Sequence, residues 1–159
     1  MTVESYKPKS ADEIAVLDLY YNLISAWNER DAHSFAKQFS GTANIVGFDG
    51  SQMQGQEQVE KELTQIFSGH QTGRYVIKLR DIRHLGKDCL LLTAIAGMIT
   101  GDNNALNPSV NAIQSLVAVK HDETWHIELF QNTPAQFHGR PEMAEAFTNE
   151  LNELIQQDA

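Results

Sequence analysis

Cysteine, proline and long apolar runs are scarce in this sequence of 159 residues. Its single cysteine, Cys89, rules out a disulfide within one chain, and the apolar neighbours of Cys89 favour a buried, unreactive thiol. No apolar run is long enough to cross a membrane, and residues 1–12 lack the apolar core of a signal peptide. We therefore expect a cytoplasmic protein without a membrane partner.

Basic side chains are also few, with 12 against 21 acidic ones and a formal net charge of -9. A surface of this sign repels nucleic acid and anionic lipid unless its charges are segregated, so no nucleic-acid partner is expected. Residues 74–87 are locally basic, which favours a solvated or dimer-facing sheet surface over an anion site. The basic side chains of this stretch are Arg74, Lys78, Arg80, Arg83 and Lys87.

Cofactor signatures are missing as well. The sequence contains no Gly-x-Gly-x-x-Gly phosphate fingerprint and no pair of cysteines. Its six histidines show no metal-ligand spacing. We therefore predict neither a nicotinamide or flavin cofactor nor a bound metal.

The length suits one domain with a single core, which we place at residues 10–159 after a flexible tail at 1–9. Ser10 and Glu13 have the spacing of a capping box, ahead of a long helix. Two adjacent apolar stripes predict that this helix is buried on a broad face. Asp31 can cap a short second helix that turns Phe35 and Phe39 inward. The two stripes of the first helix are Ile14, Leu17, Tyr21 and Ile24, and Val16, Tyr20, Leu23 and Trp27.

The middle of the chain changes from helical to extended patterns. A short strand at 43–48 and a third helix at 56–67 precede four long runs rich in β-branched and aromatic residues. Short connections make these runs antiparallel neighbours, and their length favours a strongly curled sheet. The four predicted strands are 74–85, 88–100, 109–120 and 124–132.

A last helix is predicted to begin at Pro141 and to carry an acidic outer face. The order helix, helix, strand, helix and then a four-stranded meander shows that the first three helices are not crossovers of a parallel sheet, so they must cover one side of it. We therefore predict an α+β fold, a cone of helices packed on a curved antiparallel sheet, whose open mouth suits a ligand. The inward side chains of the last helix are expected to be Met143, Phe147, Leu151 and Leu154.

Four segments carry a recognisable pattern: Trp27-Asn28-x-Arg30-Asp31-Ala32, Trp125-x-Ile127, Gln131-Asn132-Thr133-Pro134 and Phe137-His138-Gly139-Arg140-Pro141. Together they resemble the SgcJ/EcaC family, part of the SnoaL-like group of the nuclear transport factor 2-like superfamily. The resemblance covers about residues 10–145. It implies the cone-shaped fold, a homodimer formed through the sheet, and a pocket between the helices and the concave sheet face.

The superfamily includes ketosteroid isomerases, whose catalytic groups do not carry over to this chain. With Asn28 as the reference point, the position of the isomerase carboxylate base falls near Gly47. The position of the oxyanion-binding tyrosine falls near Leu23. Neither side chain can perform that chemistry, so we assign no catalytic residue.

Alternation along the last predicted strand defines two faces. We predict that the more apolar face lines the cone, with Gln131 as a hydrogen-bonding group at its end. Asn132, on the opposite face, either caps the following turn or binds the ligand. The two faces are Trp125, Ile127, Leu129 and Gln131, and His126, Glu128, Phe130 and Asn132.

On the neighbouring strand, Asn111 and Ser115 share one face with Ile113, Val117 and Val119. If this face is internal, Asn111 and Ser115 join Gln131 as uncharged polar groups in an apolar cavity. Such groups orient a ligand well and activate it poorly, since general acid–base catalysis needs a group that titrates near neutral pH.

These features predict a homodimeric SnoaL-like protein that binds a small, largely apolar organic molecule in a cone-shaped pocket. If the protein is catalytic, the expected reaction is a cyclisation, isomerisation or hydration. The alternative is a non-catalytic dimeric assembly or regulatory module whose sheet surface matters more than its pocket. The predicted ligand-binding residues are Trp27, Asn111, Ser115, Trp125, Gln131 and Asn132.

Overall fold

Helix α1 (Ala11–Asn28) begins at the predicted capping box. In the computed structural model, which describes residues 6–158, the Ser10 side chain accepts a hydrogen bond from the Glu13 backbone N–H (3.1 Å). The Glu13 carboxylate in turn accepts a hydrogen bond from the Lys9 backbone N–H (2.9 Å). Of the predicted tail, residues 1–5 lie outside the described residues, while the Tyr6 hydroxyl donates to the Ile82 carbonyl at 3.0 Å.

The buried side of α1 is narrower than the two predicted stripes. Tyr20 and Leu23 are fully buried, whereas Ile14 and Tyr21 are 50% and 44% exposed. Ile14 and Tyr21 lie seven positions apart on one edge of the helix, which faces away from the sheet. The prediction that both stripes pack inward is therefore wrong at these two positions.

After α1 the chain forms a short helix, a hairpin and a third helix. Asp31 caps α2 (Ala32–Ala36), as predicted, by accepting a hydrogen bond from the Ser34 backbone N–H (3.0 Å). Phe39, expected in this helix, instead begins a strand and is fully buried. The elements that follow are β1 (Phe39–Val46), β2 (Gln52–Gln54) and α3 (Gly55–Gly69).

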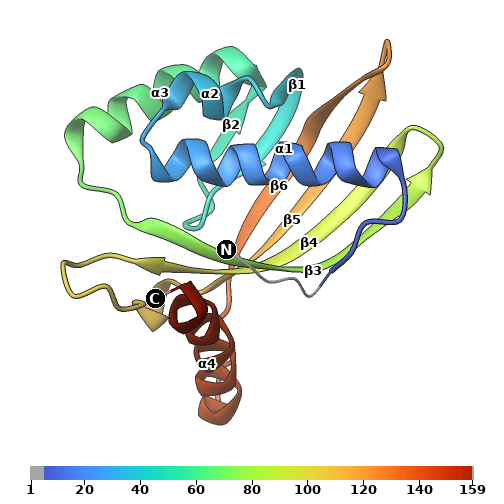
Figure 1. The fold of residues 1–159 in the computed structure, drawn as a ribbon. Coiled ribbons are helices and arrows are strands. Elements are labelled where there is room, and N and C mark those ends of the chain that lie inside the picture. Colours follow the sequence, from blue (N-terminus) through green and yellow to red (C-terminus); the bar gives the residue numbers. More distant parts are fainter. Residues whose placement is uncertain (1–5, 159) are drawn as a thin grey trace.

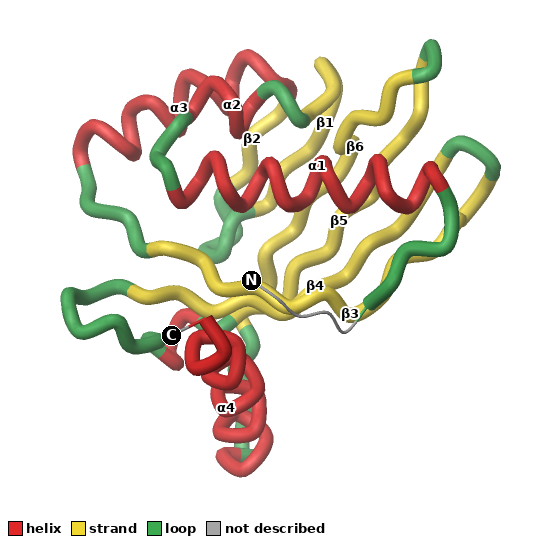
Figure 2. The backbone as a smooth tube through the Cα atoms, in the orientation of Figure 1, coloured by secondary structure: helices red, strands yellow, loops and turns green. Residues whose placement is uncertain are grey.

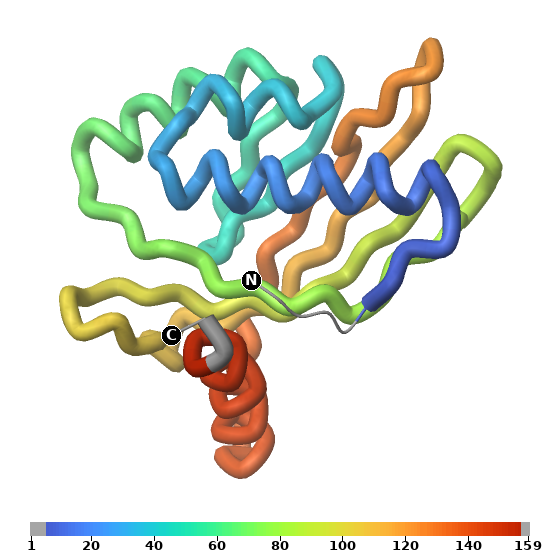
Figure 3. The backbone as a smooth tube through the Cα atoms, viewed as in Figure 1, coloured from blue at the N-terminus to red at the C-terminus, as the bar shows by residue number. Residues whose placement is uncertain are grey.

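The predicted four-stranded meander is present as antiparallel neighbours. The sheet order is β2-β1-β6-β5-β4-β3, so β1 lies beside β6, and these two strands run parallel (Figure 3). The predicted cone-shaped α+β fold is confirmed, with this parallel pair as a feature that the sequence pattern does not reveal. The meander strands are β3 (Arg74–Gly86), β4 (Cys89–Ile99), β5 (Ala112–His121) and β6 (Thr124–Pro134).

Helices cover both faces of the sheet. Helices α1, α2 and α3 lie over one face, called here the inner face, and α4 (Pro141–Asp158) lies against the opposite, outer face (Figures 1 and 2). A short 3-10 turn, η1 (Pro108–Val110), leads into β5. No helix within residues 6–158 is long and apolar enough to cross a membrane.

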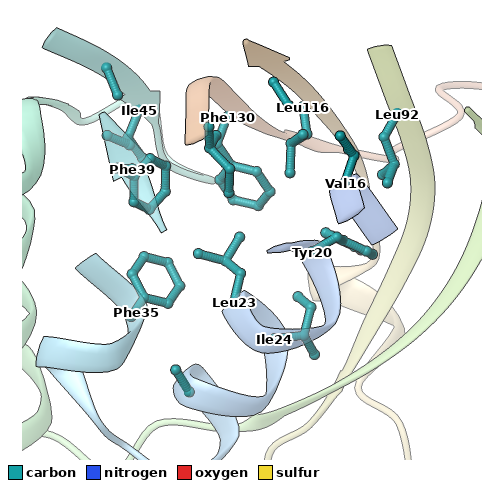
Figure 4. Close-up of a cluster of buried hydrophobic side chains, with 14 of the residues drawn as sticks. Val16, Tyr20, Leu23, Ile24, Phe35, Phe39, Ile45, Leu92, Leu116 and Phe130 are labelled. Carbon is teal, nitrogen blue, oxygen red and sulfur yellow. The ribbon is translucent and has the colours of Figure 1, made fainter. Parts of the chain in front are cut away.

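The two faces have separate hydrophobic clusters. On the inner side Leu23 of α1 points toward Phe35, Phe39 and Phe130 (Figure 4). On the outer side Phe147, Leu151 and Leu154 of α4 are buried as predicted, whereas Met143 is 40% exposed. The outer cluster comprises Ile95, Ile99, Leu106, Phe147, Leu151 and Leu154.

Candidate functional site

A cavity of about 420 Å³ lies between the three inner helices and the sheet. Its walls are mostly apolar, and they come from α1, α2, α3, the β1–β2 hairpin and the ends of β3, β4 and β6. The lining residues are Leu23, Ile24, Trp27, Phe35, Ile45, Val46, Gly47, Phe48, Asp49, Ser51, Met53, Glu62, Leu63, Ile66, Tyr75, Met98, Val110, Phe130 and Asn132.

Trp27 forms a fixed part of the cavity wall. Its indole N–H donates to the Gly73 carbonyl at 3.0 Å. Its ring packs against Phe67 and Tyr75, with centroids 5.2 and 5.4 Å away. The structure therefore places Trp27, which is half-buried, against the hydrophobic core and on the cavity wall.

A β-bulge changes which alternate residues of β6 face inward along the strand. Val117 pairs with Leu129 and Ala118 with Ile127, so Glu128 is an extra residue that shifts the alternation. Beyond the bulge, Gln131 is exposed on the outer face, and Asn132 is only 9% exposed and lines the cavity. The prediction that Gln131 lies inside is therefore wrong.

The inner face of β5 is the one opposite to the face that holds Asn111 and Ser115. Gln114 and Leu116 are fully buried on the inner face, whereas Ile113 is 39% exposed and Ser115 half-buried. Ser115 pairs in register with Gln131, so the two predicted site residues are neighbours, but on the outer face. Both faces of this strand are apolar enough that period-two alternation cannot tell the inner from the outer one.

The remaining two predicted site residues lie away from the cavity. Trp125 is buried, but its indole N–H donates to Asp12 in the first turn of α1 (3.2 Å). Asn111 is buried beneath α4, where its side-chain amide donates to the Thr148 hydroxyl at 2.8 Å. Of the six predicted ligand-binding residues, only Trp27 and Asn132 are among those that line the cavity.

Four polar side chains that are far apart in the sequence form a hydrogen-bonded row that begins in the buried core and ends at the cavity wall. The Tyr20 hydroxyl donates to Gln114 Oε1 at 2.6 Å. Gln114 Nε2 donates to Asn132 Oδ1 at 3.3 Å, and Asn132 Nδ2 donates to the Tyr75 hydroxyl at 3.1 Å. We call these four residues the tyrosine–amide row. The row links α1, β5, β6 and β3 and ends on the cavity wall.

Both tyrosines of the row stay protonated at neutral pH. Burial raises the pKa of Tyr75, although the hydrogen bond from Asn132 acts in the opposite direction. Burial raises the pKa of Tyr20 well above its ordinary value. Each hydroxyl is therefore a hydrogen-bond donor and not a base.

Two carboxyl groups, Asp49 and Glu62, also line the cavity. Asp49 is exposed, and the Ser51 backbone N–H lowers its pKa by donating to the carboxylate (2.9 Å). Glu62 is half-buried and accepts a hydrogen bond from Gln58 at 2.6 Å. No Lys, Arg or His is among the described residues that line the cavity.

The two residues that the sequence places near the positions of isomerase catalytic groups line the cavity. They are Gly47 and Leu23, and neither has an ionisable side chain. Within residues 6–158 no group of three or more His, Cys, Asp or Glu side chains is arranged to hold a metal ion. The cavity can therefore enclose a mainly apolar molecule, and the Tyr75 hydroxyl on its wall can form a hydrogen bond with that molecule.

The chain resembles known proteins at the level of fold. A family model described as a SnoaL-like domain matches residues 16–132. A solved domain of unknown function with a cystatin-like fold from Nostoc punctiforme has 23% identity and a TM-score of 0.78. That match covers 94% of this chain and 98% of the other. No curated protein sequence matches the chain.

Two further solved structures have the same fold at lower identity. An NTF-2-like protein of unknown function from Shewanella oneidensis has 12% identity and a TM-score of 0.64, covering 77% of this chain and 98% of the other. A ketosteroid isomerase-like protein from Erwinia carotovora atroseptica has 8% identity and a TM-score of 0.62, covering 80% and 99%. Together with the fold and the cavity, the family match shows that the chain belongs to the SnoaL-like domain family.

Proposed function

We propose that the chain binds a small, largely apolar organic molecule in the cavity between the inner helices and the sheet. The supporting observation is the cavity itself, at about 420 Å³ with mainly aliphatic and aromatic walls. Small-molecule sites in proteins are typically apolar clefts of roughly 300–1,000 Å³ with a few polar groups. The proposal is favoured over the assembly module because the aromatic side chains Trp27 and Phe35 line this space without filling it.

A thermal-shift titration with aromatic probes tests this proposal. Suitable probes are the ketone fluorenone and its parent hydrocarbon fluorene, which have the same planar skeleton. A ligand present at about 100 times its dissociation constant stabilises the folded protein by about 2.7 kcal/mol, which raises the melting temperature measurably. Saturable stabilisation by these probes is the expected result.

A cavity-filling variant shows where the probes bind. Ile66 of α3 lines the cavity, and the next residue on the helix toward the N-terminus, Gln65, is exposed. We expect Ile66→Trp to abolish the stabilisation and Gln65→Trp, which adds the same ring outside, to retain it. Equal stabilisation of both variants would place the probes elsewhere and contradict the proposal.

Membership of the SgcJ/EcaC branch of the family is also a proposal. It is supported by the Gln131–Pro134 segment at the end of β6 and by the Phe137–Pro141 segment, which leads into α4. Conversion of the ligand by cyclisation, isomerisation or hydration would need an acid or base on the cavity wall. The carboxyl groups available there are Asp49 and Glu62.

We further propose that two copies pair through the part of the outer sheet face that α4 leaves uncovered. Ile113 is 39% exposed there, and Val117 and Leu129 are half-buried within one chain. Pairing would remove this apolar surface from water. Sedimentation at micromolar concentration should detect a dimer, and a monomer would contradict the pairing.

A further inference from the structure

The tyrosine–amide row has a direction. An amide oxygen only accepts hydrogen bonds and an amide NH₂ only donates them. Gln114 accepts from Tyr20 and donates to Asn132, and Asn132 accepts from Gln114 and donates to Tyr75. Every donor in the row therefore points from α1 toward the cavity.

The row leaves one hydrogen atom without a partner at its cavity end. The Tyr75 hydroxyl accepts from Asn132 Nδ2 at 3.1 Å. Among the hydrogen bonds within residues 6–158, none is donated by the Tyr75 hydroxyl. Because Tyr75 lines the cavity, this hydroxyl can donate to a molecule bound there.

The position of Tyr75 is fixed at three places. The Asn28 side chain accepts from the Tyr75 backbone N–H at 2.7 Å and donates to the Tyr75 carbonyl at 3.2 Å. The Trp27 ring packs against the Tyr75 ring, and Asn132 holds the hydroxyl. A donor fixed in this way loses little conformational entropy when it binds an acceptor. The Trp27-Asn28 segment therefore serves to position Tyr75.

The polar groups of the cavity favour an uncharged ligand with an acceptor atom. An organic anion would meet Asp49 and Glu62, and none of the described lining residues is basic to balance its charge. An organic cation would pair with the carboxylates of Asp49 and Glu62 and not with the Tyr75 end, where the hydrogen bonds of the row run toward the cavity. A carbonyl oxygen in an otherwise apolar molecule fits both restrictions.

We propose that Tyr75 is the hydrogen-bond donor that recognises the ligand, and that the ligand is an uncharged apolar molecule with a carbonyl oxygen. Tyr20, Gln114 and Asn132 are positioning residues, because each holds the next and Asn132 occupies the acceptor side of the Tyr75 hydroxyl. Hydrogen bonds arranged in one direction polarise one another, so the row strengthens the final donor. This inference rests on the proposed binding of an apolar molecule in the cavity.

The test compares the affinities of fluorenone and fluorene for the 159-residue chain by calorimetry. We expect the wild-type protein to prefer fluorenone, and Tyr75→Phe to weaken fluorenone binding about tenfold while leaving fluorene binding unchanged. Tyr21→Phe, which alters an exposed tyrosine of α1 outside the cavity lining, is the matched control and should keep the preference.

The infrared carbonyl band of bound fluorenone separates a positioning role of the row from a merely structural one. In the wild-type complex the band should lie at lower frequency than in a hydrocarbon solvent, and Tyr75→Phe should remove this shift. Tyr20→Phe keeps the Tyr75 hydroxyl but shortens the row, so an intermediate shift is expected. An unshifted band in the wild-type complex would overturn the role of Tyr75, and a full wild-type shift in Tyr20→Phe would overturn the positioning role of the row.

The outcomes also separate this inference from the proposed function. Equal binding of fluorenone and fluorene by the wild type and by Tyr75→Phe would overturn the inference and leave binding in the cavity intact. Failure of both probes to bind the wild-type protein would overturn the proposed function and, with it, the inference.

Discussion

The inner and outer faces of the sheet each bury an amide side chain, but the two amides are used differently. Gln114 on the inner face is fully buried, and both ends of its amide are hydrogen-bonded. Asn111 beneath α4 is 3% exposed, and its oxygen has no hydrogen-bond partner among the described residues. An unpaired buried acceptor is costly, whereas a fully paired network fixes its members in place. The amide on the inner face is thus part of the network that ends at the cavity, and the amide on the outer face contacts helix α4.

The largest expected effects come from removing a buried leucine on each face. Leu116 and Leu151 are both fully buried, in the inner and outer clusters. Leu116→Ala should lower the free energy of unfolding of the whole domain by about 2–5 kcal/mol, because it leaves a cavity in the main core. Urea denaturation measures this loss.

Leu151→Ala should act more locally than Leu116→Ala. Because α4 packs on a small separate cluster, we expect faster amide hydrogen exchange in α4 and little change in β5 and β6. Uniformly faster exchange throughout the domain would show that the two faces unfold as one unit and would remove the distinction between them.

Substitutions in the buried polar groups should have smaller and unequal effects. Tyr20→Phe leaves Gln114 Oε1 buried without its 2.6 Å donor, so we expect a loss of about 1–3 kcal/mol. Asn111→Leu removes an acceptor that is already unpaired, together with the hydrogen bond to the hydroxyl of the half-buried Thr148, and should change stability by less than Tyr20→Phe, which leaves a buried acceptor unpaired. Chemical denaturation of both variants tests this order, and the reverse order would contradict our account of the two amides.

The ion pairs that hold α4 predict a pH dependence of stability. Glu150 accepts two hydrogen bonds from Arg80, both at 2.7 Å, and lies 3.0 Å from Lys78. The Arg80 hydrogen bonds lower the pKa of Glu150 from 4.5 to about 2. The acidic last helix thus meets the basic stretch of the sheet within one chain.

A carboxyl group whose pKa is lower in the folded than in the unfolded protein stabilises the fold at pH values above its unfolded-state pKa. This stabilisation is lost as the pH falls toward the folded-state pKa. The contribution of Glu150 should therefore be complete above its ordinary pKa of 4.5 and disappear toward about 2. Because the group is partly exposed, we expect Glu150→Gln to cost only about 1 kcal/mol at neutral pH. Denaturation of the variant and the wild type across this pH range should show the two curves converging in acid.

The smallest expected effect is that of Gln131→Leu. Gln131 is exposed on the outer face, opposite in register to Ser115 and away from the cavity lining. Stability should change by no more than about 0.5 kcal/mol, and fluorenone affinity should stay the same. A clear loss of affinity would return Gln131 to the site and show that the outer face takes part in binding.

Local features of the fold could be predicted from the sequence because they depend on neighbouring residues. Ser10 and Asp31 cap their helices, and Pro141 opens the last one. The insertion of β1 beside β6 and the packing of α4 on the outer face depend on contacts between distant segments. Helical periodicity shows that a helix has an apolar side, but not which face of a sheet that side covers.

The candidate site was harder to predict, for a specific physical reason. The bulge at Glu128 shifts the alternation of β6, which moves Gln131 outside and Asn132 inside. Tyr75 reaches the site because a curled sheet carries β3 around to the Asn28 end of α1. Gln114, an amide that alternates with alanine and leucine in β5, was the one available sign of a buried polar row.

The crystal structure of the protein in complex with fluorenone tests the central claim most directly. We predict that the ligand lies in the inner cavity beside Trp27 and Phe130, with its oxygen within about 3 Å of the Tyr75 hydroxyl. Fluorenone bound on the outer face, or bound in the cavity with its oxygen turned away from Tyr75, would contradict the account.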